Sequence, residues 1–573
     1  MRSLIDVTKL SEEYLELAIR LDELGLLPII ESENYKLMSS SQFYRLKNLV
    51  NEVENTLLQT ELFPKHFETV LGKHTTLYKT TGESSFVKGL EILIQLLPIH
   101  LETITDDSDN KAISTVMYKG SSYEIKTNNA NISEFINRHI NEFYSVLNQR
   151  SFVLARSANY QGSKATFTAA ICAIVEAFST KDVVVLDLMC GAGSVSGALS
   201  HYRSVVASDA QSFSRNLAKV QGGGIDVATA KNILSKVVDS YVSHFDLLQE
   251  EIQSDLEKEN EFLSTEISDS LCHDFSEWVL NYRRVGHENP SRRYSKSKLD
   301  LRKKNNFEKP GVLFTSYYAN LFFGVRQAAE IDSLRMAISC LDNNIYKQWA
   351  LGALTATVSY CAYSYAGHFA QPKINLSKTG DNRTQIKEIF KKRSISVHHE
   401  FIARLLSLAE ESEKKLHDVQ DVEGPWEDAL LKTDELVGDK DVFVYLDPPY
   451  TRDEFSRYYH VLETLTHYNY PEISGKASIP LKGSKGRFRS NFFTRNVSDI
   501  ENLLVEIILE CLNRKWTCLW SYSSGGMANI ARVLERLEKY TSSIELFSSK
   551  HSYAPQGKQK SKQVIEYFIL FIP

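Results

Sequence analysis

The chain has 573 residues, which is too long for one compact core and predicts two or three domains. Its apolar share of 43% and its charged share of 24% are ordinary for a folded globular protein. The net charge of −6 argues against a protein that coats nucleic acid with basic residues throughout, but it is compatible with a local basic groove.

The seven cysteines are odd in number and include no Cys-x-x-Cys pair, which argues against a zinc module and against a secreted disulfide framework. We therefore expect no metal site. No stretch reaches the ~18 uninterrupted apolar residues of a membrane helix. The first residues predict a folded helix rather than a signal peptide. These features favour a cytoplasmic protein that does not contact a membrane.

Residues 1–150 have a mixed pattern and are expected to form an α+β accessory domain. Residues 11–25 predict an amphipathic helix, residues 28–38 a hairpin, and residues 40–60 a second helix. This order occurs in winged-helix domains but also in many unrelated small domains, so binding of DNA or of a partner and plain packing both stay open. The runs KAISTVMYKG and SSYEIKT predict a further hairpin.

From residue 151 the pattern changes to apolar strands that alternate with helices. Residues 165–178 and 194–199 predict helices, and residues 182–188 and 204–209 predict strands. Strands that are apolar throughout are buried on both faces, so the pattern predicts a parallel sheet covered by helices. Later strands are expected at VFVYLDPPY, CLWSYSS and VIEYFILFI.

A long interval separates the first strands from the later ones. Residues 225–311 are strongly charged and are expected to form a mainly helical insert, a candidate target-recognition region. Apolar helices are predicted again at residues 325–341 and 345–363. The α/β domain is therefore expected to comprise residues 151–224 and 312–573.

The run DLMCGAGS follows directly after the apolar strand VVVL. Glycines at a turn from strand to helix let the backbone approach a ligand, and the helix N-terminus offers free N–H donors. Eighteen residues after Gly191, Asp209 ends the next strand, where an acid can accept hydrogen bonds from ribose hydroxyls. The third glycine of a dinucleotide fingerprint is missing. A mononucleoside ligand without pyrophosphate fits better, and a simple tight turn is the alternative.

The tetrapeptide Asp447-Pro448-Pro449-Tyr450 ends another apolar strand. A carboxylate can accept a hydrogen bond from an exocyclic amine, and the Pro448 carbonyl can accept the second amine hydrogen. The prolines stiffen the turn, and Tyr450 offers a flat face for stacking on a base, which is worth about 1–3 kcal/mol. Because parallel sheets bind ligands at this edge, a functional site is favoured over a merely rigid turn.

The pair DLMCGAG and LDPPY resembles the amino-methyltransferase family. YQGSK at residues 160–164 resembles the additional cofactor motif of the Dam-like D12-class N6-adenine DNA methyltransferases. The runs SRYYHVLETL, YYANLFFGVRQAAEIDSLR, GHFAQP and WSYSSGG are also similar to that class. The resemblance covers about residues 151–573. Met189 is a departure, since the family commonly has Phe there, but Met is apolar and soft enough to replace it.

The resemblance implies a Rossmann-like sheet that binds S-adenosyl-L-methionine and methylates N6 of an adenine flipped out of double-stranded DNA. It implies catalytic roles for Asp447, Pro448, Pro449 and Tyr450. It also implies a set of residues that contact the cofactor: Tyr160, Gly162, Lys164, Asp187, Met189, Gly191, Gly193 and Asp209. A bacterial restriction-modification or phage-defence setting, a companion restriction or defence protein and a location at the nucleoid are further expectations.

Three alternatives stay open. N4-cytosine methyltransferases use the same fold but commonly have Ser where Asp447 stands. The messenger-RNA adenine enzymes end the tetrapeptide in Trp instead of Tyr450. A non-catalytic DNA-binding subunit could have kept the fold, but the intact tetrapeptide and glycine loop argue against it.

Three basic segments are candidates for contact with DNA phosphates. Residues 283–304 hold nine Lys or Arg against two acids, and residues 373–393 hold seven against two. Residues 476–495 hold six and no acid, interleaved with phenylalanines. Such runs are usually solvated faces, but three of them in or beside the α/β half favour phosphate contact.

Overall fold

The computed structural model describes residues 103–105, 112–118, 121–127, 160, 162–165, 167–286, 311–365, 367–377, 381–474, 477–553 and 562–573. The helices and the hairpin expected within residues 11–60 lie outside these residues, as does most of the basic segment 283–304.

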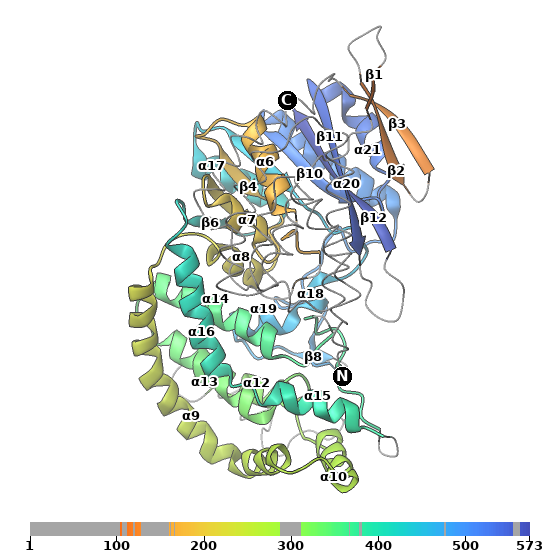
Figure 1. The fold of residues 1–573 in the computed structure, drawn as a ribbon. Helices are drawn as coiled ribbons and strands as arrows, with labels where there is room; N and C mark the ends of the chain where they lie inside the picture. Colours follow the sequence, from red (N-terminus) through yellow and green to blue (C-terminus); the bar gives the residue numbers. More distant parts are fainter. Residues whose placement is uncertain are drawn as a thin grey trace, which may run out of the picture.

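Three strands from the N-terminal part form a small antiparallel sheet: β1 (Thr103–Thr105), β2 (Ala112–Tyr118) and β3 (Ser121–Thr127). The pairing of β2 with β3 confirms the hairpin predicted from KAISTVMYKG and SSYEIKT. Figure 1 shows this sheet beside α21 (Ile530–Leu537) and beside β11 (Ser543–Tyr553), an edge strand of the main sheet. The existence of a separate N-terminal domain stays a prediction.

The main sheet has seven strands in the order β11-β12-β10-β7-β4-β5-β6. The six besides β11 are β4 (Val184–Asp187), β5 (Ser204–Ser208), β6 (Val419–Val422), β7 (Val442–Leu446), β10 (Thr517–Ser523) and β12 (Lys562–Ile572). β12 is antiparallel to both neighbours, and all other neighbouring pairs are parallel. The expected strands and the expected α/β class are thus confirmed, but the sheet is mostly parallel and not parallel throughout, because β12 runs antiparallel to both neighbours.

Helices cover both faces of this sheet: α6 (Thr168–Phe178), α7 (Ser194–Leu199), α8 (Ser212–Lys219), α17 (Trp426–Val437), α20 (Val497–Asn513) and α21. Val184 and Leu186 of β4 pack in one core cluster with α17, α20 and α21. Val183 and Val185 are equally buried, and because strand side chains alternate they face the other side, which α6, α7 and α8 cover. Burial on both faces explains why these strands are apolar throughout.

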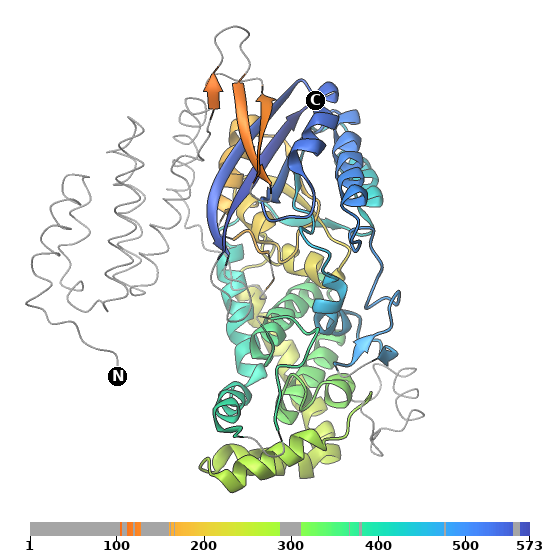
Figure 2. The same cartoon turned by 90° about the vertical axis from the view of Figure 1, so that its right-hand side faces the viewer.

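Every described element between α8 and β6 is a helix: α9 (Val227–Ser264), α10 (Asp269–Leu280), α12 (Leu313–Tyr317), α13 (Val325–Ser339), α14 (Asn344–Cys361), α15 (Arg383–Arg393) and α16 (Val397–Ser412). Figures 1 and 2 show these helices as a separate layer at one end of the α/β part, with α9 along its outer side. The helical stretch continues past residue 311 to residue 412, while the expected limits of the insert stay a prediction.

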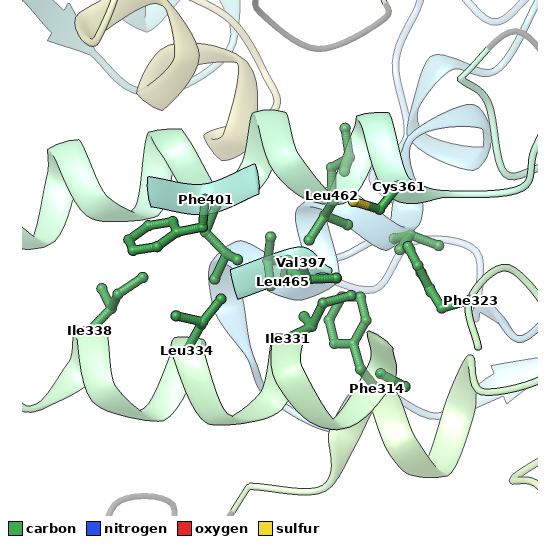
Figure 3. Packing of buried hydrophobic residues seen from close by; sticks show 14 of the residues in the cluster. Phe314, Phe323, Ile331, Leu334, Ile338, Cys361, Val397, Phe401, Leu462 and Leu465 are labelled. Carbon is green, nitrogen blue, oxygen red and sulfur yellow. The ribbon is translucent and has the colours of Figure 1, made fainter. Parts of the chain in front are cut away.

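The segment after β7 joins the two parts of the molecule. It forms α18 (Phe455–Tyr458), α19 (His460–His467) and the short hairpin of β8 (Ile473–Ser474) with β9 (Ile479–Pro480). Figure 3 shows Leu462 and Leu465 of α19 among Leu334 of α13, Cys361 of α14 and Phe401 of α16. The chain that follows the tetrapeptide is therefore anchored in the helical core. Among the described residues, no helix has the length and apolar character to cross a membrane.

Candidate active site

A cleft with a volume of about 1020 Å³ opens at the carboxyl ends of β4, β5 and β7. Residues expected to bind the cofactor and residues expected to be catalytic line it together: Tyr160, Gly162, Lys164, Asp187, Met189, Gly191, Asp209, Asp447, Pro448, Pro449 and Tyr450. Of the expected residues, Gly193 is not among those that line the cleft. This edge is where open parallel sheets bind ligands.

Two glycines in the turn after β4 are required for different reasons. Gly191 has φ +52°, and a Cβ at this position would lie 2.9 Å from Cε1 of Tyr160. The Tyr160 ring therefore packs directly against the turn. Gly193 has φ +76°, and its Cβ would lie 2.4 Å from the backbone of Ala218 in α8. The first glycine therefore shapes the cleft, whereas the second allows α7 to pack closely against α8.

Tyr160 is fixed by an aromatic stack. Its ring centroid lies 4.6 Å from that of Tyr459 with 13° between the planes, and 6.0 Å from that of Phe455. Phe455 is the first residue of α18 and Tyr459 is its C-cap, just after the tetrapeptide. The motif at residues 160–164 is thus packed against the segment that follows β7.

Asp209 joins the glycine turn to the end of β5. Its two carboxylate oxygens accept hydrogen bonds from the backbone N–H of Gly191 at 3.1 Å and of Gln211 at 2.8 Å. Burial raises the pKa of Asp209 to about 6. A carboxylate has about four lone-pair sites, so Asp209 can accept further hydrogen bonds from a ligand in the cleft.

Asp187 holds the start of α7. One of its carboxylate oxygens accepts from the backbone N–H of Ser196 at 3.1 Å and from its hydroxyl at 2.6 Å. Burial raises the pKa of Asp187 to about 7. An acid at a helix N-terminus satisfies free N–H donors, so these hydrogen bonds orient the turn that borders the cleft.

Lys164 and Asp447 form a buried ion pair in the cleft. The Lys164 ammonium donates to both carboxylate oxygens of Asp447 at 2.8 Å each, with exposed side-chain fractions of 7% and 17%. Burial raises the pKa of Asp447, although Lys164 opposes this shift. Burial alone would lower the pKa of Lys164, but the charges of Asp447 and Glu566 raise it overall. A residue expected to bind the cofactor thus contacts one expected to be catalytic.

Tyr450 is held at its ring and at its hydroxyl. The ring centroid lies 4.8 Å from that of Tyr522, and the Lys164 ammonium lies 4.6 Å from the Tyr450 ring centroid. The hydroxyl donates to a carboxylate oxygen of Glu566 and lies 3.1 Å from the Ser521 hydroxyl. The ring is therefore fixed before any ligand arrives.

Glu566 and Ser521 were not predicted as site residues. Glu566 lies on β12 opposite Ser523 of β10, and Ser521 also belongs to β10. A charged residue inside the apolar run VIEYFILFI was the available signal, because a buried acid needs partners. Trp426, which also lines the cleft, had no such signal.

The basic segments differ in how many of their cations are already paired. Arg487 donates to both carboxylate oxygens of Glu454, at 2.8 and 3.1 Å, and Arg393 is buried against Glu259 at 3.2 Å. Lys482, Lys485 and Arg489 are exposed, and Arg489 lines the cleft. Among the described residues, no group of three or more His, Cys, Asp or Glu could hold a metal ion.

A mostly parallel sheet with a glycine turn, two acids and an Asp-Pro-Pro-Tyr run at one edge defines an α/β protein compatible with a Rossmann-like methyltransferase. The model of the D12 class N6 adenine-specific DNA methyltransferase family matches residues 160–334 and 409–515, just under half of the chain.

Two curated proteins are similar to part of the chain. The type II methyltransferase M.FokI of Planomicrobium okeanokoites is 32% identical over 138 residues, which is 24% of this chain and 19% of that protein. The modification methylase LlaI of Lactococcus lactis subsp. lactis is 25% identical over 143 residues, 23% of this chain and 21% of that protein. The matched part thus spans about a fifth of the length of each relative.

Proposed function

We propose that the chain transfers a methyl group from S-adenosyl-L-methionine to N6 of an adenine in double-stranded DNA. The observation that carries the proposal is one shared cleft. The glycine turn and Asp209 line it together with Asp447 and Tyr450, so a nucleoside cofactor and a base can meet there. The match to the D12 class family model supports the same activity.

The cleft fits the cofactor in size and in chemistry. Its volume of about 1020 Å³ is sufficient for a nucleoside cofactor and a flipped base. Gly191 leaves room for the Tyr160 ring that borders the cleft, and Asp209 offers acceptors for ribose hydroxyls. When bound, S-adenosyl-L-methionine supplies an electrophilic methyl group. Tyr160, Gly162 and Lys164 are the residues proposed to border its methionine end.

The target base is proposed to enter on the side of Tyr450. Flipping a base out of the duplex costs a few kcal/mol, and stacking on an aromatic ring returns about 1–3 kcal/mol. The Asp447 carboxylate and the Pro448 carbonyl would accept the two amine hydrogens. These bonds would localise the N6 lone pair and aim it, so positioning and electrostatics would account for most of the rate.

DNA is proposed to lie along the cleft entrance. Lys482, Lys485 and Arg489 are exposed cations and Arg489 lines the cleft, whereas Arg487 and Arg393 are paired with acids and serve packing. Residues 283–304 are proposed to add phosphate contacts and to read base edges in the major groove.

A restriction-modification setting is proposed from the relatives, which are named as a type II methyltransferase and a modification methylase. The same proposal includes a phage-defence role and a companion restriction or defence protein. It also includes binding of DNA or of a partner by residues 1–150, and a cytoplasmic, nucleoid-associated location.

The test is to incubate the purified chain with labelled S-adenosyl-L-methionine and unmethylated bacterial DNA, and then to digest the DNA to nucleosides. We expect the label in N6-methyl-2′-deoxyadenosine. Label in N4-methylcytosine, or transfer to RNA alone, would refute the adenine-in-DNA assignment. Retention of DNA without transfer would indicate a binding subunit.

A further inference from the structure

Glu566 is a buried carboxylate that lines the cleft although it lies on the antiparallel strand β12, far in sequence from the glycine turn and the tetrapeptide. It is 4% exposed. An acid in such a place is costly unless it is hydrogen-bonded and paired with a cation. The hydrogen-bond and ion-pair partners of Glu566 therefore indicate its role in the cleft.

One carboxylate oxygen of Glu566 has three partners in the cleft. It accepts hydrogen bonds from the Ser521 hydroxyl at 2.9 Å and from the Tyr450 hydroxyl. The Lys164 ammonium lies 3.7 Å from the same oxygen. Glu566 thus touches the tyrosine proposed to stack on the base and the lysine paired with Asp447.

Lys164 stands between two carboxylates. It lies 2.8 Å from both oxygens of Asp447, so the ammonium occupies one lone pair of each oxygen and would compete with an amine hydrogen for that position. The other lone pairs of Asp447 can accept further hydrogen bonds, but an amine hydrogen aimed at the lone pair that Lys164 holds displaces the ammonium from that oxygen. A buried ammonium that moves away from one anion needs another anion nearby, because an unpaired buried charge is strongly unfavourable.

We propose that Glu566 is a positioning residue: it receives the Lys164 ammonium when the target amine engages Asp447, and its bond to Tyr450 fixes the stacking ring. This inference rests on the proposed function. The distances require only a small displacement of the ammonium toward Glu566, away from one oxygen of Asp447. Asp447 would then have a free acceptor while all three charges keep a partner.

The test compares Glu566→Gln with the wild-type chain in steady-state methylation of unmethylated bacterial DNA. The substitution keeps size and hydrogen bonding to Tyr450 but removes the charge that would receive Lys164. We expect kcat to fall roughly tenfold or more, as for other losses of alignment, and the apparent KM for DNA to change less than about threefold.

A pH profile separates this role from a merely structural one. Removing the negative charge of Glu566 lowers the pKa of neighbouring Asp447. Asp447 must be ionised to accept the amine hydrogen, so the acidic limb of kcat should move to lower pH in Glu566→Gln. In Glu566→Asp, which keeps the charge, the limb should stay at its wild-type position and part of kcat should return.

Glu545→Gln is the matched control, because Glu545 is 2% exposed on the neighbouring strand β11 and is not among the residues that line the cleft. Glu566→Gln with wild-type kcat and an unmoved acidic limb would overturn the inference. A fall in kcat without a shift of the limb, or no rescue by Asp, would also overturn it. If the wild-type chain itself transfers no methyl group, the proposed function fails instead.

Discussion

At the scale of single residues, the proposed chemistry depends on which atoms Asp447 touches. In the structure both of its oxygens accept from Lys164, and among the hydrogen bonds of the described residues none joins its side chain to the glycine turn. Its carboxylate is therefore held by Lys164 and not by the turn that is proposed to bind the cofactor.

Asp447→Ala is expected to abolish methylation while cofactor affinity stays within about threefold of the wild-type value. The carboxylate is proposed to touch the target amine, so its removal should appear in the chemical step, with at least the ~10²-fold fall typical of an oriented electrostatic group. Methyl transfer and calorimetric cofactor binding measure the two effects. Asp439→Ala is the control, since Asp439 is exposed at the amino end of β7. An Asp447→Ala rate above about a tenth of wild type would contradict the assignment.

Gly191→Val is expected to eliminate cofactor binding. A side chain there would collide with Tyr160 and would strain a residue at φ +52°. Gly438→Val is a suitable control, because Gly438 has φ +61° but no atom within 4 Å of its Cβ position. Both variants carry the backbone strain, so only Gly191→Val should lose cofactor affinity in calorimetry. Unchanged affinity in a folded Gly191→Val protein would place the cofactor elsewhere.

Cofactor affinity is expected to fall as the pH drops through about 6, because burial raises the pKa of Asp209 to about 6. Above that value the carboxylate is ionised and accepts strongly from ribose hydroxyls, and below it the neutral acid accepts weakly. Calorimetry across this pH range should show weaker binding but no such pH-dependent fall in Asp209→Asn. A fall near pH 7 that survives in Asp209→Asn would assign the titration to Asp187, whose pKa is about 7.

At the scale of elements, the local sequence pattern was sufficient to predict most strands of the main sheet. The strands β4, β5, β7, β10 and β12 and the helix α7 were all predicted, because burial on both faces gives continuous apolar runs. The glycine turn and the tetrapeptide were found for a related reason. Each is a continuous run of residues whose chemistry can be interpreted locally.

Features that depend on distant pairing were missed. Glu566 belongs to the cleft only because β12 pairs beside β10, which no local pattern reveals. Arg487 and Arg393 look like free cations in the sequence, but their acidic partners lie 33 and 134 residues away. Charge counts along a chain therefore overstate the cations available to DNA.

The basic segment at residues 476–495 gives a prediction about the salt dependence of DNA binding. Removing one cation that touches a phosphate should reduce the slope of log affinity against log salt by roughly one unit. Alanine at Lys482, Lys485 and Arg489 together should thus weaken binding to all DNA and lower the slope by up to about three units. Binding at two or more salt concentrations measures this change.

Lys181→Ala with Lys440→Ala is the control for that cluster, since both lysines are exposed near the amino ends of β4 and β7, away from the cleft. An unchanged slope after removal of the three cations would show that they are a solvated face. Neutralising residues 283–304 is expected to reduce the slope as well and, unlike the first cluster, to relax the choice of target sequence.

At the scale of the whole molecule, the helical layer and the sheet meet where the tetrapeptide lies. α19 is anchored between α13, α14 and α16, and Glu463 of α19 accepts from the backbone N–H of Ser212 and Phe213 at the start of α8. Movements of the helical layer would therefore be passed to the cleft. Under the proposed function, this arrangement would couple recognition of DNA by the helical layer to chemistry at the end of the sheet.

The most direct test of adenine methylation by this cleft is to sequence, for modified bases, the DNA of a bacterial host that lacks adenine methylation and expresses this chain. We predict N6-methyladenine at one recurrent short sequence, absent from the host alone and from cells that express Asp447→Ala. Adenine methylation that persists with Asp447→Ala, or DNA that stays unmodified while the wild-type protein is folded and abundant, would contradict the proposed function.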